Sequence, residues 1–195
     1  ICQNDPDHTE LEVIPATGSA GNPFVDVEPD AYYYDPVVWA VGSGITNGTD
    51  ATHFSPSADC TRGQVVTFLW RAHGSPEPTS TVNPFVDVPE DAYYYKAVLW
   101  AVEMKITNGT DATHFSPDDT CTRGQVVTFL YRDVCPGEIN ANNPFLDVPS
   151  DAYYTVPVLW AVVACVTNGT DARHFSPDAT CTRGQIVTFL YRALA

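Results

Sequence analysis

Residues 61–64 read Thr-Arg-Gly-Gln, and the same four residues return at 122–125 and at 182–185. A Thr followed three positions later by Gln forms a capping box, in which the two side chains satisfy free backbone amides at the start of an α-helix. Apolar residues then follow at i, i+3, i+4 and i+7, the spacing of a helix that buries one face: Val65, Phe68, Leu69 and Ala72. The tetrapeptide therefore predicts the start of an amphipathic helix at three places, and an Arg in its last turn complements the helix dipole: Arg71, Arg132 and Arg192.

The residues around each tetrapeptide recur in the same order. Asn-Pro-Phe begins at residues 22, 83 and 143, and Thr-Asn-Gly-Thr-Asp begins at residues 46, 107 and 167. Each copy runs over the same length, from 22 to 71, from 83 to 132 and from 143 to 192, so a one-residue difference in spacing falls in a linker. Such self-similarity indicates a repeat protein. We expect one compact domain made of unit 1 (22–72), unit 2 (83–132) and unit 3 (143–195), preceded by an N-terminal tail (1–21).

Each unit also carries a first helix and a turn. In unit 2 the pattern predicts a first helix over residues 91–104 with Asp91 as its cap, and in unit 1 Gly42-Ser43-Gly44 is the expected stop. The Asn-Gly turn and the short extended piece after it predict a small β-prong. One helical hairpin cannot bury both of its apolar faces, but three copies can do so around a shared axis. The predicted fold is mainly α: three helical-hairpin repeats with short β-prongs, forming a pseudo-threefold helical bundle.

Composition excludes several classes of function. The chain has 24 acidic and nine basic residues and a formal net charge of −15, which disfavours binding to nucleic acids and to anionic membranes. No apolar run approaches the length of a membrane span, so we expect no membrane insertion. We find no phosphate loop, metal-ligand cluster or nucleophile–base pair, and we expect no cofactor, no metal and no catalysis. A glycan-processing enzyme needs an asymmetric acid/base pair, whereas these motifs supply the same groups three times.

An arginine occupies the first position of each second helix: Arg62, Arg123 and Arg183. A cation at a helix N-terminus is unfavourable by up to about 1 kcal/mol. One interpretation is that it pairs with a carboxylate such as Asp26 or Asp87. The other is that Arg and the helix amides together hold an anionic group such as a carboxylate or a phosphate. The sequence leaves both interpretations open.

Aromatic residues, cysteines and histidines recur as well. Trp39, Trp100 and Trp160 either pack in the core or offer a platform for a sugar ring, and the Tyr runs at 32–34, 93–95 and 153–154 share this ambiguity. The three cysteines that precede the capping Thr are expected to be small buried side chains: Cys60, Cys121 and Cys181. Of the other cysteines, Cys135 and Cys165 are our choice for a disulfide in an exported protein. The spacing of the three repeated histidines fits turns better than a zinc site: His53, His114 and His174.

Phe-Val-Asp-Val-Pro, Trp-Ala-Val, Ile-Thr-Asn-Gly-Thr, Phe-Ser-Pro and Thr-Arg-Gly-Gln, in this order and in triplicate, resemble the S-layer homology domain over residues 22–195. The resemblance implies a non-catalytic module, on the bacterial cell surface, whose grooves between repeats bind secondary cell-wall polysaccharide or a peptidoglycan-linked glycan. The usual ligand is a pyruvylated amino sugar. The ligand-binding residues that the resemblance implies are Arg62, Arg123, Arg183, Trp39, Trp100, Trp160, Asp26, Asp87, Asp147, Gly48, Gly109 and Gly169.

Two departures from the family pattern bear on the ligand. The family motif is Thr-Arg-Ala-Glu, and here Gly replaces Ala and Gln replaces Glu in all three copies. Either the ligand differs from the usual one, or some grooves have lost binding. We expect a monomer attached to a larger surface protein, and the alternative function is a surface adhesin or protein-interaction scaffold.

Overall fold

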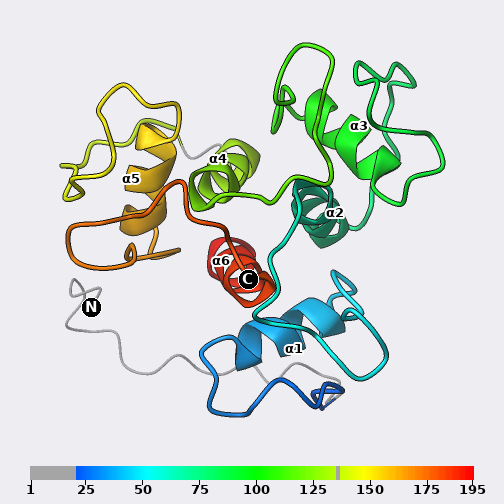
Figure 1. Ribbon diagram of the computed structural model, residues 1–195, viewed down its shortest axis with the longest axis horizontal. Helices are drawn as coiled ribbons and strands as arrows, with labels where there is room; N and C mark the ends of the chain where they lie inside the picture. Colours follow the sequence, from blue (N-terminus) through cyan, green and yellow to red (C-terminus); the bar gives the residue numbers. More distant parts are fainter. Residues whose placement is uncertain (1–20, 135–136) are drawn as a thin grey trace.

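The computed structural model describes residues 21–134 and 137–195, and this part of the chain contains six helices, two from each unit (Figure 1). They are α1 (Tyr34–Gly42), α2 (Arg62–Ala72), α3 (Tyr95–Glu103), α4 (Arg123–Val134), α5 (Thr155–Val163) and α6 (Arg183–Leu194). The prediction of a mainly helical fold built from three repeated units is confirmed.

The second helix of each unit begins where the capping box places it. The Thr61 hydroxyl accepts the Gln64 amide at 3.4 Å, and the Gln64 side chain accepts the Thr61 amide at 3.2 Å. The first helices begin later than expected. In unit 2 the helix starts at Tyr95 without a side-chain cap, and the prediction of Asp91 as its cap is wrong. Tight turns occupy residues 89–95 instead, because the amide of Ala92 bonds the Pro89 carbonyl and the amide of Tyr95 bonds the Ala92 carbonyl.

The helices pair between units. The main partner of α2 is α3, that of α4 is α5, and α6 packs against α1, so the third unit closes onto the first. Helix α6 also contacts α2 and α4. Figure 1 shows α2, α4 and α6 around the middle of the molecule, with α1, α3 and α5 outside them. Each amphipathic second helix therefore buries its apolar face against a neighbouring unit.

Backbone hydrogen bonds close the same cycle at the centre. The amide of Cys121 bonds the carbonyl of Cys60 at 2.9 Å, Cys181 bonds Cys121 at 3.1 Å, and Cys60 bonds Cys181 at 3.2 Å. Each Thr-Arg-Gly-Gln glycine also approaches the next unit, as Gly63 does by donating its amide to the Pro117 carbonyl at 2.8 Å. A Cβ atom on Gly63 would lie 3.0 Å from the Tyr94 ring, a tight contact that would require the ring to shift by a few tenths of an ångström. This closed cycle supports the expected threefold arrangement.

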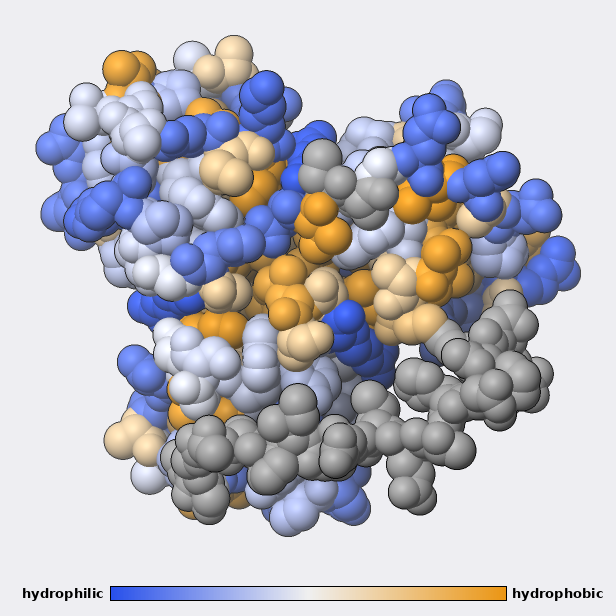
Figure 2. All heavy atoms as spheres, turned by 180° about the vertical axis from the view of Figure 1, so that it is seen from behind, coloured by the Kyte–Doolittle hydropathy of each residue, from blue (hydrophilic) through white to orange (hydrophobic). Residues whose placement is uncertain are grey.

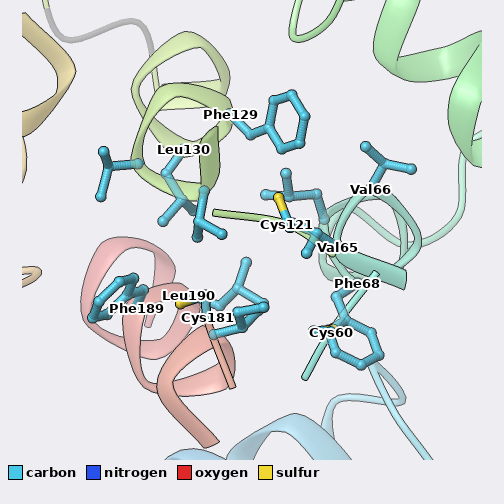
Figure 3. Packing of buried hydrophobic residues seen from close by; sticks show 14 of the residues in the cluster. Cys60, Val65, Val66, Phe68, Cys121, Phe129, Leu130, Cys181, Phe189 and Leu190 are labelled. Atoms are coloured by element: carbon cyan, nitrogen blue, oxygen red, sulfur yellow. The ribbon is translucent and has the colours of Figure 1, made fainter. Parts of the chain in front are cut away.

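The core lies between the central helices. Cys60, Cys121 and Cys181 are fully buried there among valine, leucine and phenylalanine side chains (Figure 3). This confirms that they serve as small buried side chains. Cys135 lies outside the described residues, so the Cys135–Cys165 disulfide stays a prediction.

The segments expected as β-prongs are residues 46–55, 107–116 and 167–176, which we call the prongs. They are hydrogen-bonded loops. Within residues 21–134 and 137–195, β pairing is limited to isolated bridges between units, such as that of Thr61 with Thr120. Local side-chain bonds inside each loop replace the strand pairing, because Asp and Thr side chains compete well for backbone amides.

Polar and apolar residues are segregated on the surface. Figure 2 shows one face of the molecule, with polar residues over its outer parts and apolar residues nearer its middle. None of the helices in the described part of the chain has both the length and the apolarity of a membrane span. This face therefore presents mainly polar side chains around an apolar centre.

Candidate functional site: a groove between units

A pocket of about 370 Å³ lies where the three units meet. We call it the Arg62 groove. Unit 1 contributes Arg62 and unit 3 contributes Tyr153, while unit 2 contributes the turn 107–110 and four residues of α4: Gln125, Thr128, Phe129 and Arg132. At the other two interfaces Arg123 and Arg183 make the equivalent bonds to the neighbouring unit. The groove exists only because the units assemble.

Arg62 forms the floor of this groove and is almost fully buried, with 3% of its surface exposed. Its Nε donates to the Phe115 carbonyl at 2.9 Å, and its guanidinium carbon lies 4.8 Å from the centre of the Phe115 ring. Its Nη2 is buried and has no hydrogen-bond partner. Burial lowers the pKa of Arg62, but a guanidinium remains cationic at neutral pH. A buried positive group with an unused donor therefore lines an open pocket.

The other two arginines repeat this geometry. Arg123 and Arg183 donate from Nε to the carbonyls of Phe175 and Phe54, at 3.0 and 2.9 Å. The Nη2 of Arg183 also lacks a partner, whereas that of Arg123 reaches the Thr167 hydroxyl at 3.4 Å. Each arginine thus reaches from its own helix into the next unit of the cycle.

Pairing with a carboxylate, the first interpretation of these arginines, is not what the geometry favours. Across residues 21–134 and 137–195, the ion pairs involve His or Lys with Asp or Glu, and none includes Arg62, Arg123 or Arg183. The carboxylates considered as partners are engaged elsewhere. The first interpretation is therefore not supported, and an anionic ligand at these arginines stays a prediction.

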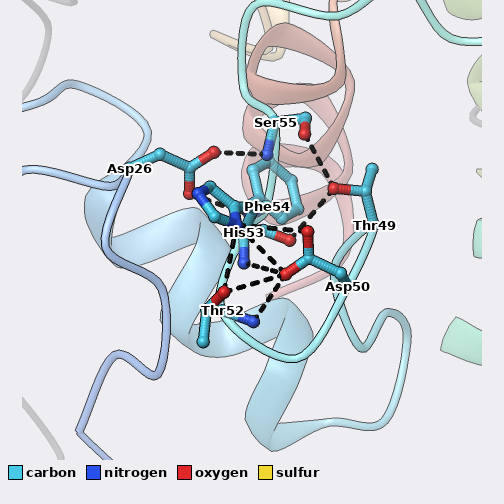
Figure 4. A network of polar contacts seen from close by, with 7 residues as sticks. All are labelled: Asp26, Thr49, Asp50, Thr52, His53, Phe54 and Ser55. Carbon is cyan, nitrogen blue, oxygen red and sulfur yellow. Dashed lines mark hydrogen bonds and ion pairs between the residues drawn. The ribbon is translucent and has the colours of Figure 1, made fainter.

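Asp87 instead fastens the prong on which Arg62 docks. Its carboxylate accepts the amides of Phe115 at 2.9 Å and Ser116 at 2.7 Å. The carbonyl of the same Phe115 accepts Arg62. Asp26 and Asp147 make the same pair of bonds in their own units, and Figure 4 shows Asp26 with Phe54 and Ser55. These aspartates therefore position the groove, and a direct contact with ligand stays a prediction.

The interior of each prong is a second polar network (Figure 4). Asp50 accepts the amides of Thr52 and His53 at 2.8 and 2.9 Å, and its carboxylate lies 3.1 Å from Nδ1 of His53. The Thr52 amide bond first and the His53 side chain next lower the pKa of Asp50 to about 2. Each repeated histidine lies in this turn beside its own aspartate, as expected for turn residues.

Gly48, Gly109 and Gly169 take left-handed backbone angles in the turns that line the grooves, with φ of +84°, +85° and +84°. A Cβ on Gly109 would lie 2.5 Å from both the His114 carbonyl and the Phe85 ring. Backbone geometry and space therefore both require glycine. A contact between these glycines and a ligand stays a prediction.

The tryptophans lie at the helix interfaces. Trp100 and Trp160 are buried, with 5% and 4% of their surfaces exposed, and Trp160 meets the Tyr131 ring with centroids 5.9 Å apart. Trp39 is half-buried and lies 5.6 Å from the Tyr191 ring. This burial favours core packing. Stacking of a sugar ring on these indoles stays a prediction, and Trp39 is the most accessible of the three.

Sequence reasoning missed Arg132 and left Tyr153 ambiguous as groove residues. Arg132 has an adequate explanation as a cation at a helix C-terminus, so nothing in the pattern singled it out. The one clue to Arg132 was its position relative to Phe129. Phe129 supports the Arg62 guanidinium at 5.4 Å and lies one helical turn before Arg132, so both residues share a face. Tyr153 is 60% exposed, and its run of aromatics did not reveal which ring faces outward.

Three helical units that pack in a cycle, each sending a buried arginine into its neighbour, define a small repeat-built domain with grooves between its repeats. The sequence profile of the S-layer homology domain matches residues 23–66, 84–127 and 144–187. The chain belongs to the S-layer homology domain family.

The chain is also similar to three characterised proteins. It is 29% identical to a cell surface protein of Thermoanaerobacter kivui over 59% of this chain and 16% of that protein. It is 30% identical to an endoglucanase of Bacillus sp. (strain KSM-635), over 60% of this chain and 12% of that protein. It is 32% identical to a surface-layer 125 kDa protein of Lysinibacillus sphaericus, over 51% of this chain and 8% of that protein. The matched region is thus a small part of each of these longer proteins.

Proposed function

We propose that this chain is a non-catalytic anchoring module that binds secondary cell-wall polysaccharide in the grooves between its units. The family and the surface proteins among its relatives support attachment to the cell surface. The observation that carries the proposal is that Arg62 lines an open groove while its buried Nη2 has no hydrogen-bond partner. An unsatisfied buried donor on a charged group costs more than about 1–3 kcal/mol, and an anionic sugar substituent removes that cost.

The groove residues then have distinct roles. Arg62, Arg123 and Arg183 supply the charge that meets the anion, for which a pyruvylated amino sugar is the proposed source. Glycines 48, 109 and 169 keep the turn close to the sugar, the aspartates hold the prongs, and the tryptophans support the walls. Gln125 sits in the groove where the family motif has Glu, so no carboxylate from that position competes with the ligand for Arg62.

The module acts outside the cell, at the wall, and carries no activity of its own. The endoglucanase and the surface proteins that it resembles are far longer than the matched region. We therefore propose that this chain is a monomeric anchor within a larger surface protein, whose other parts supply the activity.

Sedimentation with purified cell walls of the source organism tests the proposal. We expect the chain to sediment with intact walls and to remain in solution once the secondary polymer has been removed chemically. The triple variant Arg62→Gln, Arg123→Gln and Arg183→Gln should lose sedimentation. Arg173→Gln is the matched control, because this exposed prong arginine lies outside the groove lining. Equal binding to walls with and without the polymer would refute the proposal.

A protein-binding scaffold is the second candidate. The observation in its favour is an exposed apolar side chain at the same place in every unit: Val25, Val86 and Leu146, at 68%, 77% and 65% exposure. Under this alternative the arginine triple variant would sediment fully with walls. Substitution of these three apolar residues by Ser would then abolish binding instead.

A further inference from the structure

We propose that each groove contains a second cationic contact, made by Arg132 in the Arg62 groove and by Arg192 and Arg71 in the other two, and that the ligand presents two negative charges to each groove. This inference rests on the proposed function. It adds a second arginine to the one in the Thr-Arg-Gly-Gln motif. It also requires the saccharide to carry another acidic group beside the single carboxylate of a pyruvyl substituent.

The two guanidinium groups belong to one surface. Arg62 and Arg132 both line the Arg62 groove. The guanidinium of Arg62 lies over the Phe129 ring, and Arg132 follows Phe129 on the same face of α4. Arg132 is held in place by a hydrogen bond from Nη1 to the Ile106 carbonyl at 3.0 Å. Within the described residues, this is the one hydrogen bond that the Arg132 side chain makes.

The second arginine has the same anchor in all three units. Arg71 donates from Nη1 to the Ile45 carbonyl at 3.2 Å, and Arg192 donates to the Val166 carbonyl at 3.1 Å. In each case the accepting residue directly precedes the Thr-Asn-Gly turn of the groove wall. The second arginine is therefore anchored in the same way in every unit.

Charge balance then indicates the ligand. Six of the nine Lys and Arg residues of a chain with net charge −15 occupy these two positions, and the lining of the Arg62 groove includes no Asp or Glu. Two cations placed together repel each other, and an anion between them removes the repulsion. Asp119 and Asp87 act electrostatically on Arg62, but both lie outside the groove lining, and Asp87 is already bonded to two backbone amides. A unit with two negative charges matches the pair of cations.

A purely structural role for Arg132, fastening the turn to α4, is the competing explanation. Lysine and glutamine separate the two roles, because both can donate to the Ile106 carbonyl but only lysine keeps the charge. We therefore compare the triple variant Arg71→Gln, Arg132→Gln and Arg192→Gln with the matching lysine variant. The readout is the dependence of wall binding on salt, which reports the number of charged contacts and does not respond to a structural role.

We expect the glutamine variant to bind walls at least tenfold more weakly, with a shallower salt dependence, and the lysine variant to keep the wild-type slope. A wild-type slope in the folded glutamine variant overturns the inference. The proposed function is tested separately by the Arg62/Arg123/Arg183 variant, whose failure to lose binding would refute anchoring in the groove itself.

If the variants do not fold, the number of charges that the groove accepts is tested on the unmodified chain by competition with small anions. Acetate, malonate and methyl phosphate are added to wall-bound protein at pH 8 and at equal ionic strength. Release by malonate well below the acetate concentration supports two carboxylates, and release by methyl phosphate supports one doubly charged phosphate. If acetate releases the protein as effectively as both dianions, the groove accepts a single charge and the inference is wrong.

Discussion

Single residues in the groove wall are fixed by backbone geometry before any ligand is considered. Gly109 combines a φ of +85° with contacts that leave no room for a Cβ atom. The left-handed angle alone costs an alanine about 1 kcal/mol, and the clash adds about 1–3 kcal/mol. We expect Gly109→Ala to lower the free energy of unfolding by more than about 2 kcal/mol, measured by urea denaturation.

Gly42→Ala is the control for this substitution. Gly42 is the last residue of α1, and nothing lies within 4 Å of the position that its Cβ would occupy. Alanine there should leave stability unchanged or raise it by up to about 1 kcal/mol. Equal effects of the two substitutions would mean that the turn is less constrained than its geometry indicates.

The buried thiols give the chain a characteristic response to alkali. Burial raises the pKa of Cys60 and of Cys181 to about 12 and also raises that of Cys121, whereas an unfolded thiol ionises near 8.5. The folded state therefore keeps protons that the unfolded state releases. Their stabilising effect is complete below about pH 8.5 and is lost as the pH rises toward 12, by about 1.4 kcal/mol per pH unit for each thiol.

We expect the melting temperature to fall steeply above about pH 9, as followed by circular dichroism. Substituting Cys60, Cys121 and Cys181 by Ala should flatten this dependence. The three thiols should also resist a thiol reagent at pH 8 until the chain unfolds. A melting temperature that is constant from pH 8 to 11 would show that burial does not hold these protons.

Among single residues, the sequence singled out those whose position conflicts with the usual preferences of a helix end. Arg62 stood out because a helix N-terminus disfavours cations. Arg132 did not, because its place satisfies the same rule. Asp87 was tied to the groove through family resemblance, and its actual partners are amides 28 and 29 residues away. Such long-range bonds follow from packing and leave no periodic signal.

Among the structural elements, the prong depends on one carboxylate at its base. Asp87 accepts the backbone amides of Phe115 and Ser116. These two bonds position the Phe115 carbonyl, which accepts the hydrogen bond from Arg62. Hydrogen bonds to a charged group contribute about 1.5–3 kcal/mol. We expect Asp87→Asn to destabilise the chain by about 1–3 kcal/mol in urea unfolding, because an amide group can accept only on its oxygen.

Asp118→Asn is the control, since it removes the same charge from a residue exposed at the surface. If Asp87 acts mainly on the prong, wall binding by Asp87→Asn should return to near wild type under conditions in which the variant is fully folded. Binding that remains lost in the folded variant would instead identify Asp87 as a direct ligand contact.

The second helices were predictable because the capping Thr, the Gln three residues later and the apolar stripe all agree. The first helices were harder. Asp91 is a good capping residue, but turns after Pro89 delay the helix to Tyr95, and a propensity argument cannot weigh two local alternatives of similar free energy. The prongs were expected to contain strands. In unit 2 the backbone amides of Thr113 and His114 donate to the Asp111 carboxylate and hold the prong as a loop.

The whole molecule depends on contacts that no unit can make alone. The repeat pattern predicted three units and a shared core, but it did not reveal which helices pair. That pairing, α2 with α3, α4 with α5 and α6 with α1, is set by complementary faces that are nearly identical in all units. The Arg62 groove is consequently an interface between units, and the proposed binding would require the complete cycle.

Removal of unit 3 tests this dependence. A chain of residues 21–134 lacks α5 and α6, so α4 and α1 lose their main partners and two of the three central Cys–Cys backbone bonds disappear. We expect the full chain to unfold in a single thermal transition and the truncated chain to show no cooperative transition. A full-length chain cleaved in the linker between residues 75 and 82 is the control. It keeps every helix pair, and it should retain its helical signal and wild-type elution in size-exclusion chromatography. Cooperative melting of residues 21–134 near the full-length temperature would show that each interface folds independently and that closure of the cycle contributes little.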